Sequence, residues 1–579
     1  MSQAFGTMES PLDALRSPVE NGVSYDGNPI PRLWALLKLE SRDLWVVVIY
    51  SIGVGLLTLA VPVAVQAVVN FIAFGSLLQP LVVLTLFVLV ALGFSSVMNG
   101  FRVFTVEIIQ RRLFVRVTTD FALRLVRVKT ETFDRLYGPE LVNRFFDVVT
   151  VQKSAAALLM DGLSLVMQTA LGMILLAVYH PLLLAFDIFL LLAMALIIFV
   201  FGRGAVPSAI KESKAKYAIA AWLEEIAAHV PVFKSTSGGA YALGQIDWLA
   251  KEYLTRRKAH FRVVMGQIAG SLALQAVASA LLLGIGGFLV MQGQLTLGQL
   301  VAAELIVTTV VSGFSKFGKK LETYYDMLAA LDKLGQVIDL PLERSGFARP
   351  SRSDAPASVR LTDVSLGPSS GEPALDRISM RVEPGERIAV AGPSGSGKSA
   401  LARILGGLRT AESGVLLADG LDTRDLSPSE FRENAALVSD ADVISATIER
   451  NVSLGRGDVG LEQVGEALEQ VGLLEETLAL PEGLQTKLSG GGAPLTNAQA
   501  ERLVLARAIT GKPRLLIVDG VLDRVADSTV LESICRTLFD RGAPWTLICI
   551  TNRPDLTALC DRSFRLERGK LREIDGFDG

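Results

Sequence analysis

The sequence predicts an α-helical domain that crosses a lipid bilayer six times, followed by an α/β domain built around a phosphate-binding loop. Half of the 579 residues are hydrophobic and only 20% are charged, which excludes a single small soluble domain. The long uncharged stretches all lie before residue 340, and an octet typical of phosphate loops begins at Gly392. These three observations together predict the fold class.

Changes in composition divide the chain into four expected segments. Residues 1–43 are mostly polar and should form a cytosolic N-terminal segment without a signal peptide. Residues 44–340 hold the apolar spans. Residues 341–357, rich in Pro, Ser, Arg and Asp, interrupt the apolar and helical patterns and are expected to form a linker. Residues 358–579 then have the composition of an ordinary soluble domain.

Three regions with almost no charged residue are each long enough for two spans of about 20 residues. They are Leu44–Phe101, Gly162–Phe201 and Val263–Phe314. Each divides at a short polar or turn-forming stretch, and these stretches are Gly75–Pro80, His180-Pro181 and Gln292–Gln294. The pattern therefore predicts six membrane helices in contact with the lipid bilayer.

The connections between these regions predict the orientation. Residues 102–153 and 203–262 carry ten Lys and Arg each, whereas the three opposite connections carry none. The positive-inside rule then places the two basic loops, and both termini, on the cytoplasmic side. The loops have helical composition, so we expect the membrane helices to continue into the cytoplasm.

Neither half of the chain is charged as a nucleic-acid-binding protein would be. Residues 1–340 hold 28 basic and 24 acidic residues, a net charge of +4, which leaves 28 and 35, a net charge of −7, for the rest. No basic excess is concentrated in either half, so no nucleic acid is expected as a partner.

Two ionisable residues, Asp187 and Glu304, fall within the expected spans. A charge inside a membrane is costly and often marks a functional path. The alternative is that both residues lie near a helix end or in a wide polar cavity and only shape it. The sequence leaves these two interpretations open and does not identify a transported substrate.

The phosphate loop follows the apolar run Arg387–Ala391 and precedes the helix-like run Ala400–Leu408. Its residues are Gly392, Pro393, Ser394, Gly395, Ser396, Gly397, Lys398 and Ser399, and Ala400, which follows, is expected to bind the nucleotide with them. Glycines allow backbone N–H groups to surround phosphate oxygens, Lys398 can reach the outer phosphates, and the Ser399 hydroxyl can bind Mg²⁺. The context predicts a nucleotide site, with a loop that keeps the pattern but binds nothing as the alternative.

A second apolar run, Arg514–Val518, ends at Asp519. An acidic residue at the end of a strand beside a phosphate loop is placed to hold magnesium through water. The alternative is an ordinary surface aspartate after a buried strand.

The six spans, basic loops, linker and phosphate-loop domain resemble a half-transporter of the ATP-binding cassette (ABC) exporter family, over Leu44–Ile574. Leu295–Ala302 is similar to the branch that includes type I secretion and bacteriocin exporters. Phe133-Asp-Arg135, with Leu141–Arg144 and Asp147, is similar to the first coupling-helix segment of the family.

The resemblance implies two cofactors, ATP and Mg²⁺, and a location in the bacterial inner membrane. It also implies a dimer with a second half-transporter subunit, in which each nucleotide site joins one subunit's phosphate loop to the other's signature motif.

Leu488–Gly492 looks like the LSGGQ signature of the family, but its spacing argues against that role. Counting back from Leu505–Ala508 places the signature at Leu495–Gln499 instead. The residues there that would face the partner site are Thr496, Asn497, Ala498 and Gln499. Thr496 and Gln499 fit a capping box, so a helix N-terminus is still expected to face phosphate.

The positions that the resemblance assigns to catalysis do not hold the residues that the family has there. Gly520 stands where the family has a water-polarising glutamate, and Asn552 stands where it has a switch histidine. Ser439-Asp440 replaces a glutamine, and Gly367-Pro368 replaces an adenine-stacking aromatic residue. No residue is assigned a catalytic role.

Three functions remain open at this point. The first is an export subunit that binds ATP-Mg²⁺ but hydrolyses it weakly or not at all, beside a catalytically intact partner. The second is a homodimeric, ATP-gated membrane scaffold or regulator that transports nothing. The third is an ordinary ATP-hydrolysing homodimeric exporter. Whether ATP is hydrolysed decides between the first and the third.

Overall fold

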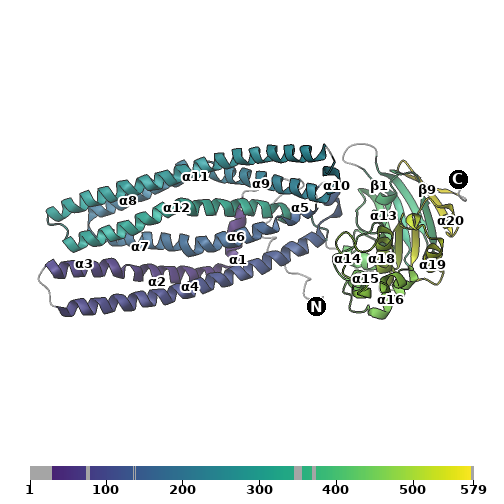
Figure 1. Cartoon of the computed structure of the whole chain (residues 1–579), viewed down its shortest axis with the longest axis horizontal. Helices are drawn as coiled ribbons and strands as arrows, with labels where there is room; N and C mark the ends of the chain where they lie inside the picture. The colour runs from purple at the N-terminus through teal and green to yellow at the C-terminus, as the bar shows by residue number, and fades with distance from the viewer. Residues whose placement is uncertain are drawn as a thin grey trace. The chain divides into compact units, whose positions relative to one another are not determined.

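The computed structural model describes residues 29–73, 78–134, 136, 138–235, 237–344, 355–367 and 373–574 (Figure 1). The chain forms two compact units. Unit 1 consists of Met1–Val128 and Arg135–Pro341, and unit 2 consists of Lys129–Asp134 and Leu342–Gly579. Three positions of the expected segments lie outside the described residues. They are Gly75 of the expected hairpin, Arg135 of the coupling segment and Pro368 of the adenine region.

The described part of unit 1 is built from helices, and its long helices run side by side (Figure 1). Its α-helices are α1 (Pro29–Leu39), α2 (Ser41–Thr58), α3 (Ala60–Ala73), α4 (Leu78–Arg127), α5 (Gly138–Val142), α6 (Phe145–Ala157), α7 (Leu163–Tyr179), α8 (Pro181–Leu196), α9 (Ala205–Ala228), α10 (Val230–Phe233), α11 (Gly238–Met291) and α12 (Leu297–Ile338). Short π-helical turns, η4 (Leu158–Gly162) and η5 (Ile197–Phe201), precede α7 and follow α8.

Five helical segments among the described residues are long and apolar enough to span a membrane, and Leu297–Val310 in α12 is a shorter apolar segment. The five are Ser41–Ile72, Gln79–Arg127, Glu140–Tyr179, Pro181–Phe201 and Gly238–Met291. The first and last expected spans thus fall on α2–α3 and α12. The predicted transmembrane domain is confirmed as helical.

The helices are longer than a bilayer requires. α4 has 50 residues, α11 has 54 and α12 has 42, against about 20 needed to cross the hydrocarbon core. These three helices are long enough to continue into the cytoplasm, and that continuation stays a prediction. Large apolar side chains on them remain exposed, such as Phe104 at 65% and Leu283 at 64%, which suits contact with acyl chains.

Unit 2 contains two sheets. β1 (Val359–Leu366), β2 (Leu375–Val382), β4 (Ser413–Ala418) and β5 (Leu421–Asp422) form an antiparallel sheet in the order β2-β1-β4-β5. The second sheet has the order β10-β9-β3-β8-β7-β6 and is parallel except for its β10–β9 hairpin. Its strands are β3 (Arg387–Ala391), β6 (Ala435–Val438), β7 (Leu515–Asp519), β8 (Thr546–Ile550), β9 (Arg562–Glu567) and β10 (Lys570–Ile574).

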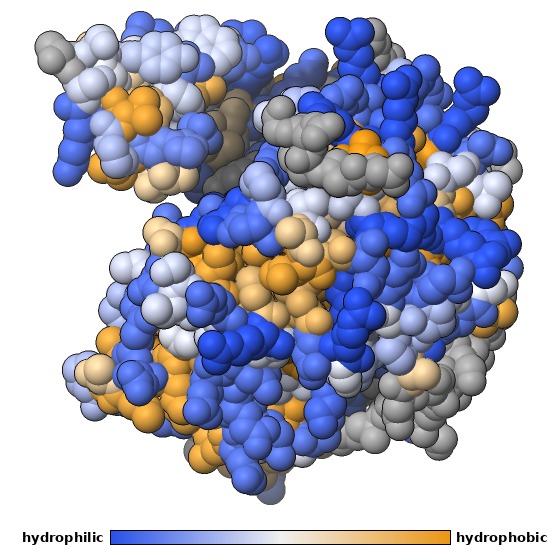
Figure 2. Space-filling model, turned by 90° about the vertical axis from the view of Figure 1, so that its right-hand side faces the viewer, coloured by the Kyte–Doolittle hydropathy of each residue, from blue (hydrophilic) through white to orange (hydrophobic). Residues whose placement is uncertain are grey.

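Eight α-helices are described in unit 2. They are α13 (Lys398–Leu405), α14 (Pro428–Asn434), α15 (Ile448–Ser453), α16 (Leu461–Gln470), α17 (Leu474–Leu478), α18 (Asn497–Thr510), α19 (Ser528–Leu538) and α20 (Pro554–Thr557). Figure 2 looks onto a face of this unit, which is mainly hydrophilic with smaller hydrophobic patches. Such a surface is ordinary for a soluble domain.

The central parallel strands bring the loops of the site together. β3 and β8 are buried along their whole length, as expected for strands covered on both faces. Val390 and Asp519 both pair with Ile550, so the loops that follow β3, β7 and β8 leave the sheet at one carboxyl edge. Ligands bind at this edge in open α/β sheets.

Candidate functional site

The phosphate loop connects β3 to α13 and has a backbone that only glycine adopts easily. Gly392, Gly395 and Gly397 have φ values of 156°, 79° and 107°. A Cβ atom at Gly392 would collide with the Leu566 carbonyl oxygen, and one at Gly397 with the Ala374 carbonyl oxygen. The loop can therefore pass close to its neighbours and end at the N-terminus of α13, where the helix dipole favours an anion.

Lys398 lies across this loop. Its Nζ donates to the carbonyl oxygens of Gly392 at 2.5 Å and Pro393 at 2.8 Å. Burial lowers the pKa of Lys398, while the nearby charges of Asp519 and Asp523 oppose that shift. The ammonium group of Lys398 thus lies against the backbone of the loop. A bound phosphate would offer it a stronger hydrogen-bond acceptor than these carbonyl oxygens.

The hydroxyl groups of the loop differ in their surroundings. Ser396 is buried, and its Oγ has no hydrogen-bond partner among the described residues. Ser394 and Ser399 are exposed, as is Pro393, and Ala400 is half-buried in the first turn of α13. A buried hydroxyl without a partner is costly, so a phosphate oxygen at the loop would satisfy Ser396.

The expected magnesium residues, Ser399 and Asp519, fit the ion by their chemistry. Asp519 ends β7 at the same edge of the sheet as the phosphate loop. β8 lies between β7 and β3, the strand that the loop follows. A hydroxyl and a carboxylate are oxygen ligands of the kind that Mg²⁺ prefers. No group of three His, Cys, Asp or Glu residues that could hold a metal occurs in the described part. Phosphate and water would supply the remaining ligands.

Gly520 follows Asp519 with a left-handed backbone. Its φ is 70°, and its N–H donates to the Ile550 carbonyl oxygen at 3.0 Å. A Cβ atom there would meet nothing within 4 Å. The position has room for a side chain, but its backbone conformation strains any residue except glycine. Sequence spacing singled out Gly520 but gave no sign of its left-handed backbone.

Asp523 is a site residue that the sequence analysis missed. One of its carboxylate oxygens accepts from the Thr551 hydroxyl, and the other accepts from the Asn552 N–H at 3.3 Å. Asp523 therefore fastens the segment after β7 to the segment after β8. The acidic side chain nearest in sequence after Gly520 is engaged in these two contacts.

Asn552 contacts the phosphate loop directly. Its Oδ1 accepts from the Gly392 N–H at 3.0 Å. Asn552 thus holds the first residue of the loop from the neighbouring strand, a contact that sequence spacing did not predict. An amide can keep such a hydrogen bond but cannot exchange a proton near neutral pH.

The N-terminus of α18 has the expected capping box. Thr496 Oγ1 accepts from the Gln499 N–H at 3.3 Å, and Gln499 Oε1 accepts from the Thr496 N–H at 2.7 Å. Asn497 and Ala498 are exposed in the first turn. The Leu488–Gly492 stretch lies in the preceding loop, where Leu488 is buried and bonded to Ala446.

The remaining expected positions lie on loops. Asp440 is exposed and accepts from the Ser439 hydroxyl at 3.2 Å, and Arg524 donates to the Ser439 carbonyl oxygen at 2.9 Å. Gly367 is described only up to the gap that follows it, and its N–H donates to Glu412 at 3.2 Å.

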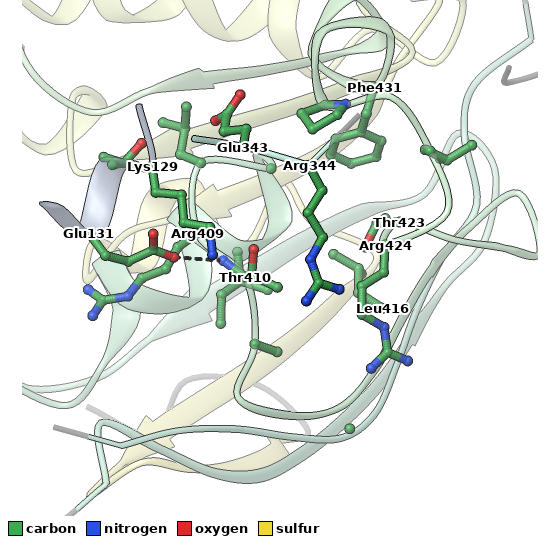
Figure 3. A pocket seen from close by; sticks show the side chains of 18 residues that line it. Lys129, Glu131, Glu343, Arg344, Arg409, Thr410, Leu416, Thr423, Arg424 and Phe431 are labelled. Atoms are coloured by element: carbon green, nitrogen blue, oxygen red, sulfur yellow. Dashed lines mark hydrogen bonds between the residues drawn. The ribbon is translucent and has the colours of Figure 1, made fainter. Parts of the chain in front are cut away.

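A cavity of about 310 Å³ lies at the other end of α13, within unit 2 (Figure 3). Ile404 and Gly407 line it together with Lys129–Glu131, the start of the short 3-10 helix η3 (Thr130–Asp134). Glu131 accepts from the Thr410 N–H at 3.3 Å, drawn as the dashed line, and Asp134 pairs with Arg409 at 3.1 Å. α13 therefore connects the phosphate loop to the segment that resembles a coupling helix.

The two ionisable residues of the spans lie in different surroundings. Asp187 is 3% exposed, and neither of its carboxylate oxygens has a hydrogen-bond partner among the described residues. Glu304 is half-buried, and its Oε2 also lacks a partner there. A cavity of about 250 Å³ lies beside α2, α7 and α12, with Thr58, Gln168 and Thr309 as its polar lining.

Two family profiles match the sequence. The ABC transporter transmembrane region matches residues 44–314, and the ABC transporter domain matches residues 375–522. A solved bacterial Atm1-family ABC exporter with ATP bound has the same fold, with a TM-score of 0.82 over 92% of this chain and 96% of that chain, at 19% identity.

Curated relatives include proteins of several descriptions. A putative export ATP-binding/permease protein of Rickettsia bellii is 25% identical over 94% of this chain and 95% of its own length. The ATP-dependent lipid A-core flippase of Burkholderia orbicola is 31% identical over 62% of this chain and 60% of its own length. A multidrug efflux ATP-binding/permease protein of Mycobacterium tuberculosis is 29% identical, and the match spans only 27% of its length. The two profiles together cover well over half of the sequence, and the chain belongs to the ABC transporter family, with the domain order of an exporter half-transporter.

Proposed function

We propose that this chain is an export subunit that binds ATP-Mg²⁺ and hydrolyses it weakly or not at all. It works in a dimer with a catalytically intact half-transporter in the bacterial inner membrane, with both termini in the cytoplasm. In this proposal residues 44–340 form the export domain, 341–357 the linker and 358–579 the ATP-binding domain. One observation carries it: the loop for phosphate is complete, while Gly520 places no side chain beside Asp519.

Binding is supported by the loop itself. Gly392, Gly395 and Gly397 have the backbone that a phosphate cradle requires, and Lys398 and Asp519 lie near enough for their charges to interact. The buried Ser396 hydroxyl lacks a partner that a phosphate oxygen would supply. Ser399 and Asp519 would hold Mg²⁺, which neutralises phosphate charge when it is bound.

Weak hydrolysis is supported by the groups around the loop. A positioned acid or base contributes on the order of 10² to 10⁴ in rate. Gly520 has no side chain for that role, and Asn552 cannot carry a proton. The Asp523 carboxylate already accepts hydrogen bonds from Thr551 and Asn552, so it is a poor substitute base.

A partner subunit is supported by the exposed N-terminus of α18. Thr496, Asn497 and Ala498 are exposed there, and a helix N-terminus favours phosphate. This surface would complete the partner's nucleotide site. Asn497 and Ala498 stand where the signature of the family has two glycines, so the backbone here cannot approach a phosphate as closely. This loss favours the second candidate, a homodimeric scaffold or regulator.

The finer family branch is also a proposal. Leu295–Ala302 supports a place near the type I secretion exporters. Thr296 and Gln299 of that segment form the capping box of α12, so part of the motif serves helix capping. Cargo is left open because the cavity beside α2, α7 and α12 is mainly apolar with few polar groups.

Binding and hydrolysis should be measured on the same full-length protein in lipid nanodiscs. We expect saturable ATP binding that requires Mg²⁺ and is weakened in Lys398→Ala, together with phosphate release no faster than in that variant. Turnover near 1 per second or above that disappears in Lys398→Ala would reject the proposal in favour of an active exporter.

A further inference from the structure

A hydrophobic groove lies at the corner between α1 and α2, at the start of the first membrane span. It has a volume of about 520 Å³, and its lining includes Trp34, Leu37, Leu44, Trp45 and Val48. Trp34 and Trp45 are both 68% exposed. Two exposed tryptophans beside an apolar groove are unusual for a surface in water, and tryptophan is enriched at membrane–water interfaces.

The helix α1 lies across the direction of the long helices in Figure 1. One face is anchored: Leu36 packs into a core cluster with Leu331 and Leu334, and Arg32 pairs with Asp339 at 2.5 Å. The other face carries Trp34. A short helix with one apolar exposed face, placed across a bundle next to a span, matches an interfacial helix.

The acidic and basic residues of α1, α2 and their junction differ in whether they form ion pairs. Glu40 pairs with Arg116 at 2.9 Å and Asp43 pairs with Arg112 at 2.5 Å, so both acids are held by α4. Lys38 and Arg42 are exposed and form no ion pair within the described part of the chain. Lys38 also lines the groove. The corner therefore presents two free cations beside an apolar surface.

We propose that this groove binds an anionic phospholipid of the membrane leaflet that adjoins α1. Its acyl chain lies along Leu37, Leu44 and Val48 between the two tryptophans, and its headgroup phosphate is held by Lys38 and Arg42. The charge of the corner selects an anionic headgroup over a zwitterionic one. This site is independent of the nucleotide site and of the transported cargo.

The test is native mass spectrometry of the full-length protein released from nanodiscs with equal phosphatidylglycerol and phosphatidylcholine. The wild type should retain mainly phosphatidylglycerol. One surface cation is worth roughly a fivefold preference, so Lys38→Gln with Arg42→Gln should lower the retained ratio about 25-fold. Trp34→Ala with Trp45→Ala should lower retention of both lipids.

The matched control is Lys258→Gln with Trp248→Ala, since both residues are exposed on α11 away from the groove and Trp248 is 58% exposed. It should behave as the wild type. Equal retention of the two lipids by the wild type, or an unchanged ratio after loss of Lys38 and Arg42, would overturn the proposal.

A second measurement compares the wild type with a conservative variant that preserves aromatic side chains in the groove. Brominated phosphatidylglycerol should quench the tryptophan fluorescence of the wild type more than brominated phosphatidylcholine does. The difference should vanish in Trp34→Phe with Trp45→Phe, a conservative pair. Equal quenching by the two lipids in the wild type would contradict headgroup selection.

Discussion

The segments after β3 and after β7 leave the sheet at the same edge, yet they have different kinds of residue. After β3, each glycine of the phosphate loop has a backbone or a close contact that requires it, and Lys398 and Ser399 follow in order. After β7, Asp519 is followed by Gly520, whose Cβ position is open. Gly392 and Gly397 make close contacts possible, whereas Gly520 leaves a space without a side chain.

The proposed function implies that binding and cleavage of a phosphate can be separated within one site. A cradle depends on backbone geometry and on one cation, and these can be retained alone. Cleavage needs a further group in a fixed position. In the proposed function, the loss of that group leaves the cradle unchanged. Substitutions in the segments after β3, β7 and β8 and at the N-terminus of α18 test that separation.

The largest effect is expected from restoring the missing groups. Gly520→Glu with Asn552→His should raise ATP hydrolysis on the order of 10² to 10⁴ over the wild type, since each group contributes through acid–base catalysis or positioning. Phosphate release measures it. Gly520→Gln with Asn552→His is the matched control, because it has the same backbone strain without a carboxylate. An equal rise in the control would show that the carboxylate is not the missing element.

Removal of the Lys398 ammonium group should weaken the binding of phosphate by the loop. Lys398→Ala should weaken ATP binding by roughly 10- to 150-fold, because a hydrogen bond to a charged group is worth about 1.5 to 3 kcal/mol. Isothermal titration calorimetry of the full-length protein measures it. Arg403→Ala, in the last turn of the same helix, should leave the affinity unchanged. Unchanged binding in Lys398→Ala would mean that the loop does not hold the phosphates.

The backbone of Gly520 should make a simple substitution costly. Gly520→Ala should destabilise unit 2 by about 1 to 2 kcal/mol, because a φ of 70° is unfavourable for alanine. Gly465→Ala, also at an open position but inside α16, should instead stabilise by about 0.5 to 1 kcal/mol. Thermal unfolding of the full-length protein compares the two. A neutral Gly520→Ala would show that this backbone adapts freely.

The smallest effect concerns the cap of α18. Thr496→Ala should cost about 1 kcal/mol of stability, as should Thr447→Ala, which removes the N-cap of α15. Only Thr496→Ala should also slow ATP hydrolysis by the dimer with an intact partner subunit. If both variants slow it equally, the effect is one of stability and Thr496 does not serve the partner's site.

Local patterns in the sequence were enough to predict the fold class and the strand–loop–helix order around the phosphate loop. The uncharged runs predicted a helical membrane domain, and the apolar runs before Gly392 and Asp519 predicted β3 and β7, with boundaries that differ by at most one residue. The helix after the loop begins at Lys398 and ends at Leu405, three residues before the expected end. Gly406 and Gly407 end it, since Gly407 has a φ of 67°.

The contacts between loops were not predictable from spacing. Asp523 meets Thr551, and Asn552 meets Gly392, only because β3, β8 and β7 are neighbours in the sheet. The left-handed backbone of Gly520 leaves no mark on the pattern of residue types, because glycine is compatible with any conformation. Such features depend on contacts between residues far apart in sequence.

The short helix η3 has a practical consequence for anyone who wishes to study the nucleotide domain alone. Residues 129–134 belong to unit 2 although they precede the rest of it by more than 200 positions. A fragment that begins at residue 342 would lack the acidic groups that meet Thr410 and Arg409. Such a truncated protein would also lack the residues that close one side of the cavity beside Ile404, Gly407 and Phe431.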